Sequence, residues 1–277
     1  MSQNPLRAIH HERLILIVTV AFIIATTGCA STARSRSALQ IDPTKIIDLT
    51  YSFNADTIYW PTAQPFKLQR VAYGRTPGVF FYHANNISAA EHGGTHMDAP
   101  LHFAEGAITT ERVPLRNCIG PAVVIDVTRA AARDADYRVS LDDLRTWETR
   151  HGRIPAGAIV IMNSGWGQRW PDKKRYLGTD TPGDVANLHF PGFLKEAAEF
   201  LVNERDIAAI AVDTPSIDYG QSKDFIVHQI VSSANIPAFE NVANVDRLPA
   251  SGAMLIALPM KIEGGSGGPT RIIAVVP

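Results

Sequence analysis

The amino-acid sequence predicts a single domain of the α/β class, because strand-like and helix-like segments alternate along it with no internal repeat and no second linker. The strand-like segments are short runs rich in β-branched residues and bounded by turn residues. Strands are predicted at residues 45–49, 79–88, 122–127, 158–162, 207–212, 253–258 and 271–276. The helices between them make this alternation typical of an α/β sheet.

Capping residues delimit the first predicted helix, residues 141–150. Ser140 precedes it, Asp142 and Asp143 lie in its first turn, and Gly152 lies just beyond its end, as is typical of helix termini. Apolar residues at helical spacing predict two further helices, at residues 193–204 and 225–234.

The first residues have the pattern of an export signal. Arg7 and Arg13 precede an apolar run at residues 14–25. This run is shorter than the about 20 residues that cross a bilayer, but it suits the core of a signal peptide. Small residues before Cys29 resemble a bacterial lipoprotein processing site, in which the cysteine becomes the lipidated first residue. Thr26 stands where that pattern more often has leucine, so ordinary signal cleavage is an alternative.

The predicted order of the chain is therefore a signal peptide, a tether and one large domain. We expect the signal peptide at residues 1–28, a flexible tether at residues 29–44 and the domain at residues 45–277. The protein is expected in the periplasm or cell envelope, where it touches the membrane only through a lipid on Cys29. Since Cys118 is then the remaining cysteine, no internal disulfide forms, and Cys118 is expected to be a small buried residue.

The charge of the chain does not favour nucleic acid as a partner. The formal net charge is −1, and the 26 lysine and arginine residues are scattered along the sequence. Such a distribution offers no basic stripe that could follow a phosphate backbone. The candidate functional residues are histidines and acids instead.

One stretch, residues 92–103, gathers three histidines and an aspartate around two glycines and a proline. On a straight strand its first and last histidines would lie about 33 Å apart, too far for one ion. Gly93 and Gly94 disfavour a helix, and Pro100 moves the residue before it out of the α region. We therefore expect the stretch to fold back on itself in a turn or loop that gathers several side chains.

The donor atoms of this stretch favour a catalytic metal site over a structural one. Imidazole nitrogens with a carboxylate and no thiolate suit zinc, manganese or iron with one coordination position open for water or substrate. The alternative is a polar loop in which each histidine is hydrogen-bonded to backbone. A lone histidine would favour that alternative, whereas four such side chains in one short stretch favour metal. They are His92, His96, Asp98 and His102.

The same stretch resembles the H-x-G-T-H-x-D-x-P-x-H signature of the metal-dependent cyclase-like hydrolase family, which includes bacterial kynurenine formamidase and isatin hydrolase. All seven fixed positions are occupied, by His92, Gly94, Thr95, His96, Asp98, Pro100 and His102. The resemblance extends over nearly all of the domain. It implies a swivelling β/β/α type of domain and a homo-oligomer, most simply a dimer.

The resemblance also implies roles for individual residues. It implies one or two divalent ions per chain, Mn²⁺ or Zn²⁺, held by His92, His96, Asp98, His228 and Glu240. Asp98 would bridge the two ions, which would lie about 4 Å apart and clamp a water between them. His102 is implied to be the catalytic histidine that moves a proton from this water to the leaving nitrogen. The alternative is that His102 is a further ligand.

Four further residues are candidates for contacts around the substrate. Trp60 and Trp166 lie beside proline or glycine in expected loops and suit a flat substrate, although a tryptophan is more often part of the core. Asp213 and Ser216 follow a predicted strand and are candidates for orienting ligands or substrate. The alternative is an ordinary Asp-Thr-Pro turn.

Together these features predict a metal-dependent amidohydrolase that acts on non-peptide C–N bonds. The expected substrate is a small aromatic amide, either a cyclic amide of the isatin type or an N-formyl arylamine. The predicted export favours the isatin type, because breakdown of formylkynurenine takes place inside cells. The alternative from another class is a non-catalytic, membrane-anchored protein that binds metal or a small molecule. His102 discriminates between the two, since a pure binder needs no base beside the ion.

Overall fold

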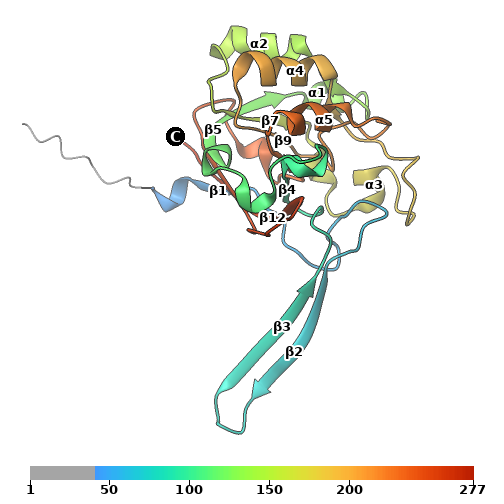
Figure 1. The fold of residues 1–277 in the computed structure, drawn as a ribbon, viewed down its shortest axis with the longest axis vertical. Helices are drawn as coiled ribbons and strands as arrows, with labels where there is room; N and C mark the ends of the chain where they lie inside the picture. Colours follow the sequence, from blue (N-terminus) through green and yellow to red (C-terminus); the bar gives the residue numbers. More distant parts are fainter. Residues whose placement is uncertain (1–40) are drawn as a thin grey trace, which may run out of the picture. The chain divides into compact units, whose positions relative to one another are not determined.

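Eight strands join in one sheet that closes into a barrel in the computed structural model, which describes residues 41–277 (Figure 1). Their order in the sheet is β1 (Ile46–Asp48), β12 (Gly267–Val275), β11 (Met254–Pro259), β5 (Ile119–Asp126), β7 (Ile159–Asn163), β9 (Ala209–Val212), β10 (Ala238–Glu240) and β4 (His96–Asp98). The barrel closes because the first residues of β12 pair with β4, while its last residues pair with β1. The α/β class is confirmed, and the closure is a feature that the sequence does not predict.

Some predictions from the sequence lie outside the described residues. They are the signal peptide at residues 1–28, the lipid on Cys29 and most of the tether at residues 29–44. Residues 41–44 are exposed and lead through a 3₁₀ turn, Pro43–Lys45, into β1. Within residues 41–277, no helix has the length and apolar character needed to cross a membrane.

The four neighbouring strands in the middle of the sheet order are buried on both faces. β5, β7, β9 and β10 run parallel to one another, which is typical of sheets covered on both sides. Successive residues of a strand point to opposite faces. Val123 and Ile125 of β5 therefore belong to one apolar cluster, and Ala122 and Val124 belong to another. The second cluster receives side chains from all eight strands, so it fills the interior of the barrel.

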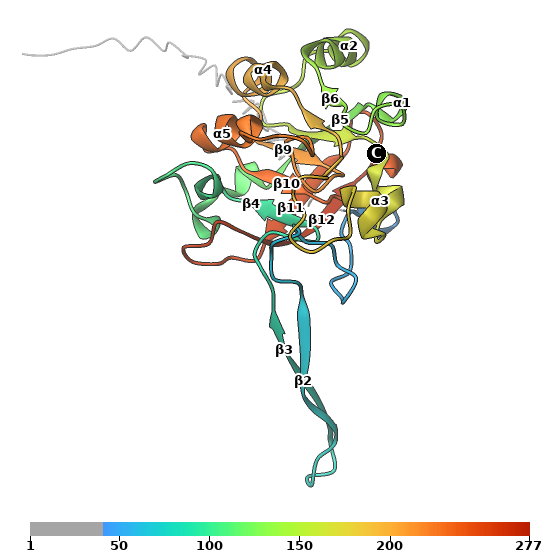
Figure 2. The same cartoon turned by 90° about the vertical axis from the view of Figure 1, so that its right-hand side faces the viewer.

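Three helices pack against the first of these clusters, outside the barrel (Figure 2). They are α2 (Leu141–His151), α4 (Lys195–Arg205) and α5 (Ile226–Ser233), and they confirm the three predicted helices within two residues at each end. Ser140 and Asp143 form the capping box at the start of α2. The remaining short elements are α1 (Thr128–Ala131), α3 (Lys173–Leu177) and the parallel pair β6 (Arg138–Val139) and β8 (Gly192–Phe193).

A long hairpin extends away from the barrel (Figures 1 and 2). It consists of β2 (Lys67–Arg75) and β3 (Phe81–Ser88), which pair with each other and with no other strand of residues 41–277. We call this hairpin the arm. The predicted strand at residues 79–88 corresponds to β3, whereas β2 is not predicted, because a strand exposed on both faces lacks a regular apolar alternation.

Two of the strands near the histidine cluster are also not predicted from the sequence. β4 and β10 have only three residues each, too few for a periodic pattern, and all six residues are buried. Cys118, in contrast, is buried as expected, and this burial raises the pKa of its thiol to about 11.

Candidate metal centre

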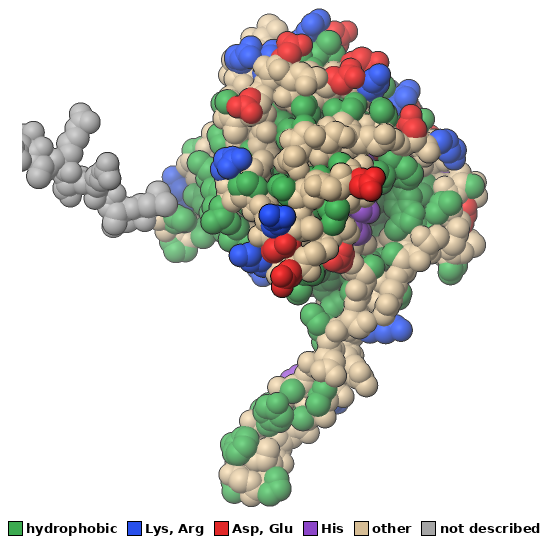
Figure 3. All heavy atoms as spheres, viewed as in Figure 1, with side chains coloured by type: hydrophobic (Ala, Val, Ile, Leu, Met, Phe, Trp, Pro, Cys, Tyr) green, Lys and Arg blue, Asp and Glu red, His purple; other side chains and the backbone are tan. Residues whose placement is uncertain are grey.

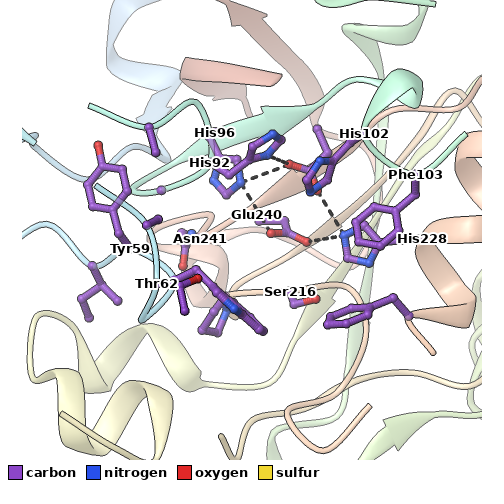
Figure 4. Close-up of a pocket in the computed structure, with 18 residues that line it drawn as sticks. Tyr59, Thr62, His92, His96, His102, Phe103, Ser216, His228, Glu240 and Asn241 are labelled. Carbon is purple, nitrogen blue, oxygen red and sulfur yellow. Dashed lines mark hydrogen bonds and ion pairs between the residues drawn. The ribbon is translucent and has the colours of Figure 1, made fainter. Parts of the chain in front are cut away.

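The stretch at residues 92–102 folds back on itself, as predicted from its glycines and proline. Gly93 forms a bridge with Tyr59, and a Cβ atom at this position would overlap the Tyr59 ring. Gly94 follows with a φ of +58°, a conformation that favours glycine. After β4 the chain turns again through a 3₁₀ turn, Pro100–His102. These two turns bring all three histidines to one side of the same pocket (Figure 4).

Asp98 lies between two groups of converging ligand atoms. Its Oδ1 atom lies 2.6 Å from His92 Nδ1 and 3.1 Å from His96 Nε2. Its Oδ2 atom lies 3.1 Å from His228 Nε2. The carboxylate therefore faces one group with each oxygen, which is the arrangement that a carboxylate bridging two ions requires.

Glu240 completes the second group and lies close to the first. Glu240 Oε1 lies 3.2 Å from His228 Nε2, and Glu240 Oε2 lies 3.5 Å from His96 Nε2. Within each group the ligand atoms lie within 4.8 Å of one another. The pairing of β10 with β4 brings Glu240 close to the first group, because Glu240 lies directly opposite His96. His228 arrives from α5 on the outside of the barrel.

Each of the three imidazoles is oriented by a second hydrogen bond away from the centre. His96 Nδ1 lies 2.9 Å from the Gly94 carbonyl oxygen, and His228 Nδ1 lies 2.7 Å from Asp218 Oδ2. Both partners are acceptors, so in each neutral ring the proton is on Nδ1 and the lone pair on Nε2 points at the centre.

The His92 ring is also oriented by an outer hydrogen bond, but here Nε2 makes that bond and Nδ1 faces the centre. Ser266 Oγ donates its proton to Glu91 Oε2 at 2.6 Å, so it accepts a hydrogen bond from His92 Nε2 at 2.9 Å. The lone pair of the neutral His92 ring is therefore on Nδ1, which faces Asp98. Glu91 and Ser266 are thus the outer partners that orient this imidazole.

The atoms that face one another in this centre are therefore all hydrogen-bond acceptors, and such an arrangement fits a metal site. Three imidazole lone pairs and two carboxylates converge, and the buried His96 Nε2 atom makes no hydrogen bond within residues 41–277. Burial lowers the pKa of His96 and of His228, but hydrogen bonds and charges from the neighbouring carboxylates more than offset this and raise both pKa values. The cluster therefore requires positive charge, and nitrogen and oxygen donors of this kind suit Zn²⁺ or Mn²⁺.

His102 lies outside both groups of ligand atoms. Its ring stacks on the His92 ring, with centroids 3.8 Å apart and an angle of 18° between the planes. Burial, followed by the neighbouring imidazoles, lowers the pKa of His102 to about 4, although Asp98 acts in the opposite direction. The lowered pKa keeps the His102 ring neutral at pH 7. The ring makes no hydrogen bond within the described residues, so its unprotonated nitrogen is available to a ligand in the pocket.

A pocket of about 300 Å³ opens over the metal centre. His92, His96, Asp98, His228 and Glu240 all line it, and its other walls are largely aromatic. The Phe103 ring lies 4.4 Å from the His228 ring, and Phe225 lies edge-on to Trp60 at 6.2 Å. Its volume is at the lower end of the range for small-molecule sites, and its aromatic walls suit a small flat ligand.

The structure brings some of the predicted substrate residues to this pocket and not others. Trp60 and Ser216 line it. Trp166 does not, because its indole is buried in an apolar cluster and donates a hydrogen bond to the Tyr176 carbonyl. Asp213 also lies elsewhere, where its carboxylate accepts hydrogen bonds from Ser164 and Trp166. Trp166 and Asp213 therefore lie outside the pocket, because internal packing and hydrogen bonds already use both side chains.

Several residues that orient the centre are missed by sequence reasoning. Asp218 lies ten residues before His228 in a loop, and it also accepts hydrogen bonds from the backbone N–H groups of Val227 and His228 at the start of α5. Asp218 lies eight residues before the start of α5, so no local spacing marks it as the partner of His228. Glu91 and Ser266 lie far apart in the sequence, so only the folded chain reveals their relation to His92.

Comparisons with known proteins agree with this geometry. The profile of the Cyclase family, described as "Putative cyclase", matches residues 47–219. An isatin hydrolase of Roseibium aggregatum is 35% identical over 205 residues, which cover 71% of this chain and 76% of that protein. A kynurenine formamidase of Salinibacter ruber is 25% identical over 228 residues, which cover 82% of this chain and 96% of that protein.

A solved structure shares the fold as well as the sequence. Isatin hydrolase A from Ralstonia solanacearum superposes with a TM-score of 0.76 at 35% sequence identity, covering 84% of this chain and 92% of that chain. The family profile spans more than half of the chain, and the converging histidines and carboxylates supply the metal site that the family signature implies. The chain therefore belongs to the cyclase-like family of metal-dependent hydrolases.

Proposed function

We propose that this protein is a metal-dependent amidohydrolase that opens the ring of a small cyclic aryl amide of the isatin type. The observation that carries the proposal is the position of the metal centre, which forms the floor of an aromatic pocket of about 300 Å³. The similarity to isatin hydrolases at 35% identity supports the same substrate class.

The reaction adds water across the amide C–N bond and yields a carboxylate and an arylamine. Bound divalent ions supply Lewis acidity for the carbonyl and lower the pKa of water. His102, neutral at pH 7, accepts a proton from the attacking water and returns it to the departing nitrogen. Trp60, Phe103 and Phe225 hold the aryl ring and exclude bulk water from the centre.

The donor set is compatible with either Zn²⁺ or Mn²⁺, which would be distinguished by availability and by the number of bound waters. The His228–Asp98–Glu240 group and the His92–His96–Asp98 group each offer three ligand atoms. We propose two ions per chain, because each group by itself offers three ligand atoms that lie within 4.8 Å of one another.

Cleavage of an N-formyl arylamine is the second candidate activity. It is favoured by the similarity to kynurenine formamidase over 96% of that protein's length. Both substrates present an aryl ring and an amide carbonyl, so the same centre would act on either. A non-catalytic metal-binding protein is disfavoured by His102, which lies within stacking distance of a ligand ring but outside both ligand groups.

The test is turnover of isatin and of N-formylkynurenine by the full chain, reconstituted separately with Zn²⁺ and Mn²⁺. We expect isatin to be opened with the higher kcat/KM. Faster cleavage of N-formylkynurenine would replace the first candidate by the second. A metal-loaded chain that turns over neither compound would contradict the proposed substrate class.

We also propose that the protein is exported and anchored by a lipid on Cys29, as the N-terminal sequence predicts. Metabolic labelling with palmitate, followed by membrane fractionation, tests this. The label and the membrane association should be lost in the Cys29→Ala variant. A labelled Cys29→Ala variant, or a wild-type chain in the cytoplasmic fraction, would contradict the proposal.

A further inference from the structure

The outer face of one half of the barrel is apolar. Strands β1, β12, β11 and β5 pair antiparallel in this half, and their side chains alternate between the barrel interior and the outside. Directly paired residues point to the same face of a sheet, so the register identifies the outward-pointing side chains. They are Ile46, Asp48, Ile119, Pro121, Met254, Ile256, Leu258, Arg271, Ile273 and Val275. We call these ten residues the outer sheet face.

Four apolar side chains of the outer sheet face are exposed to solvent. The exposed fraction is 37% for Ile46, 41% for Ile119, 43% for Met254 and 45% for Leu258. Helices α2, α4 and α5 pack on the other half of the barrel, since the apolar cluster beneath them contains no residue of β1, β11 or β12. Figure 3 shows hydrophobic side chains gathered at the left-hand edge of the domain, where the described chain begins.

The outer sheet face departs from the pattern of an ordinary solvated sheet. An antiparallel sheet with one face in water usually carries polar side chains on that face. Here eight of the ten outward residues are apolar. The two charged ones, Asp48 and Arg271, neutralise each other through hydrogen bonds of 2.7 and 3.1 Å. A continuous apolar surface of this kind is typical of one that another molecule covers.

The chain enters the domain at this face. β1 follows directly after the 3₁₀ turn Pro43–Lys45, and its first residue, Ile46, belongs to the outer sheet face. Twelve residues separate Ile41 from Cys29, the proposed point of lipid attachment. Because such a length of chain spans no more than about 40 Å when fully extended, a lipid on Cys29 keeps the start of the domain close to a bilayer.

Charge at the entry to the domain favours an anionic lipid surface. Residues 29–41 contain Arg34 and Arg36 and no acidic residue. Lys45 is exposed directly before β1, and Asp42 is the acidic residue beside it. Basic residues next to a membrane are attracted to anionic headgroups, which brings neighbouring apolar side chains to the boundary between headgroups and acyl chains.

We propose that the outer sheet face lies on the surface of an anionic bilayer when Cys29 carries its lipid, with Met254 and Leu258 in contact with acyl chains. None of its ten residues lines the catalytic pocket or belongs to the arm, so this contact leaves the lining of the pocket free. The proposal rests on the proposed lipid anchor and does not depend on the identity of the substrate.

The test is quenching of a fluorescent label by nitroxide-labelled lipid. The lipidated chain is purified from membranes and returned to vesicles of phosphatidylethanolamine and phosphatidylglycerol that contain this lipid. The label reacts with Met254→Cys alone, because the Cys29 sulfur carries the lipid and Cys118 is buried. We expect a quenching constant about 10-fold larger at Met254→Cys than at Thr146→Cys, the matched control at an exposed position of α2.

A charge on the outer sheet face should lift the face from the bilayer and leave the lipid anchor in place. Leu258→Asp, combined with the label at Met254→Cys, should lower the quenching constant about 10-fold, because a carboxylate resists transfer out of water. Thr146→Asp in the same labelled background adds the same charge on α2 and should leave quenching unchanged. Far-ultraviolet circular dichroism shows that each variant is folded, and the comparison of Met254→Cys with Thr146→Cys decides the question without either charge.

Three results would overturn the proposal, and they can be told apart. Equal quenching at Met254→Cys and Thr146→Cys in a chain that carries the lipid would overturn this proposal alone. A label at Met254→Cys that is shielded from aqueous iodide but is not quenched by the nitroxide lipid would show that a protein surface covers the face. A chain without lipid on Cys29 would overturn the proposed anchor together with this contact.

Discussion

Two buried polar clusters lie at the same end of parallel neighbouring strands, and they differ in how their atoms are partnered. Glu240 ends β10 and belongs to the metal centre, whereas Asp213 directly follows β9. Asp213 accepts hydrogen bonds from the Ser164 hydroxyl at 2.6 Å and from the Trp166 N–H at 3.0 Å. The acceptor oxygens of Asp213 therefore face hydrogen-bond donors, whereas the acceptor atoms of the metal centre face other acceptors.

The difference shows which of two similar clusters requires a cation. The Asp213 carboxylate is satisfied by groups of its own chain, although burial raises its pKa to about 6 against the effect of those hydrogen bonds. At the metal centre every outer nitrogen of the three rings has a partner, and every inner nitrogen faces a carboxylate. Asn241 lies between the clusters, since its amide donates to the Gly94 carbonyl and its Oδ1 lies 2.9 Å from the Tyr176 hydroxyl. The first cluster stabilises the fold, and the second is built to bind.

The largest expected effect comes from the carboxylate that both ligand groups share. Asp98→Asn should lower kcat/KM by on the order of 1000-fold or more, because it removes the carboxylate that both ligand groups share and leaves neither group complete. Steady-state hydrolysis measures this effect. Glu240→Gln alters only one group and should retain measurable activity. Equal activity of Asp98→Asn and the wild type would remove the proposed distinction between the two clusters.

Removal of the proton carrier should have the next largest effect. His102→Asn should lower kcat about 100- to 10,000-fold, which is the usual contribution of a general base. Metal content should stay at the wild-type value, since His102 lies outside both ligand groups. Loss of metal from this variant would instead make His102 a ligand.

The smallest effects are expected for substitutions of Asp218, which orients a ligand of the metal centre, and of Asp213 in the other cluster. Asp218→Asn should weaken metal binding about 10- to 100-fold, because the amide orients His228 less well than the carboxylate. Asp213→Asn should leave metal affinity unchanged and lower the free energy of unfolding by about 1–3 kcal/mol, because the new amide N–H₂ meets existing donors. Metal titration and urea denaturation separate the two. Weakened metal binding in Asp213→Asn would show that the clusters are not independent.

The part of the metal centre that comes from one short segment of the chain is predictable from the sequence. His92, His96 and Asp98 stand within seven residues of one another, and their residue types alone indicate a ligand set. His228 and Glu240 look like ordinary helix and loop residues, so only the family resemblance selects them before the structure brings them to Asp98.

The remaining features depend on tertiary contacts that leave no local pattern. Three-residue strands such as β4 and β10 take their conformation from the neighbours that pair with them. Trp166 is buried because α3 packs over it and supplies the Tyr176 carbonyl. The strand β2 is not predicted because it pairs only with β3 and not with any strand of the barrel. Its sequence therefore lacks the regular apolar alternation of a strand that covers a core.

Elemental analysis of the full chain purified without chelator tests the account most directly. Two three-atom ligand groups that share Asp98 predict about two divalent ions per chain in the wild type, about one in Glu240→Gln and almost none in Asp98→Asn. A folded wild-type chain that hydrolyses isatin with no bound metal, or an Asp98→Asn chain that keeps both ions, would contradict it.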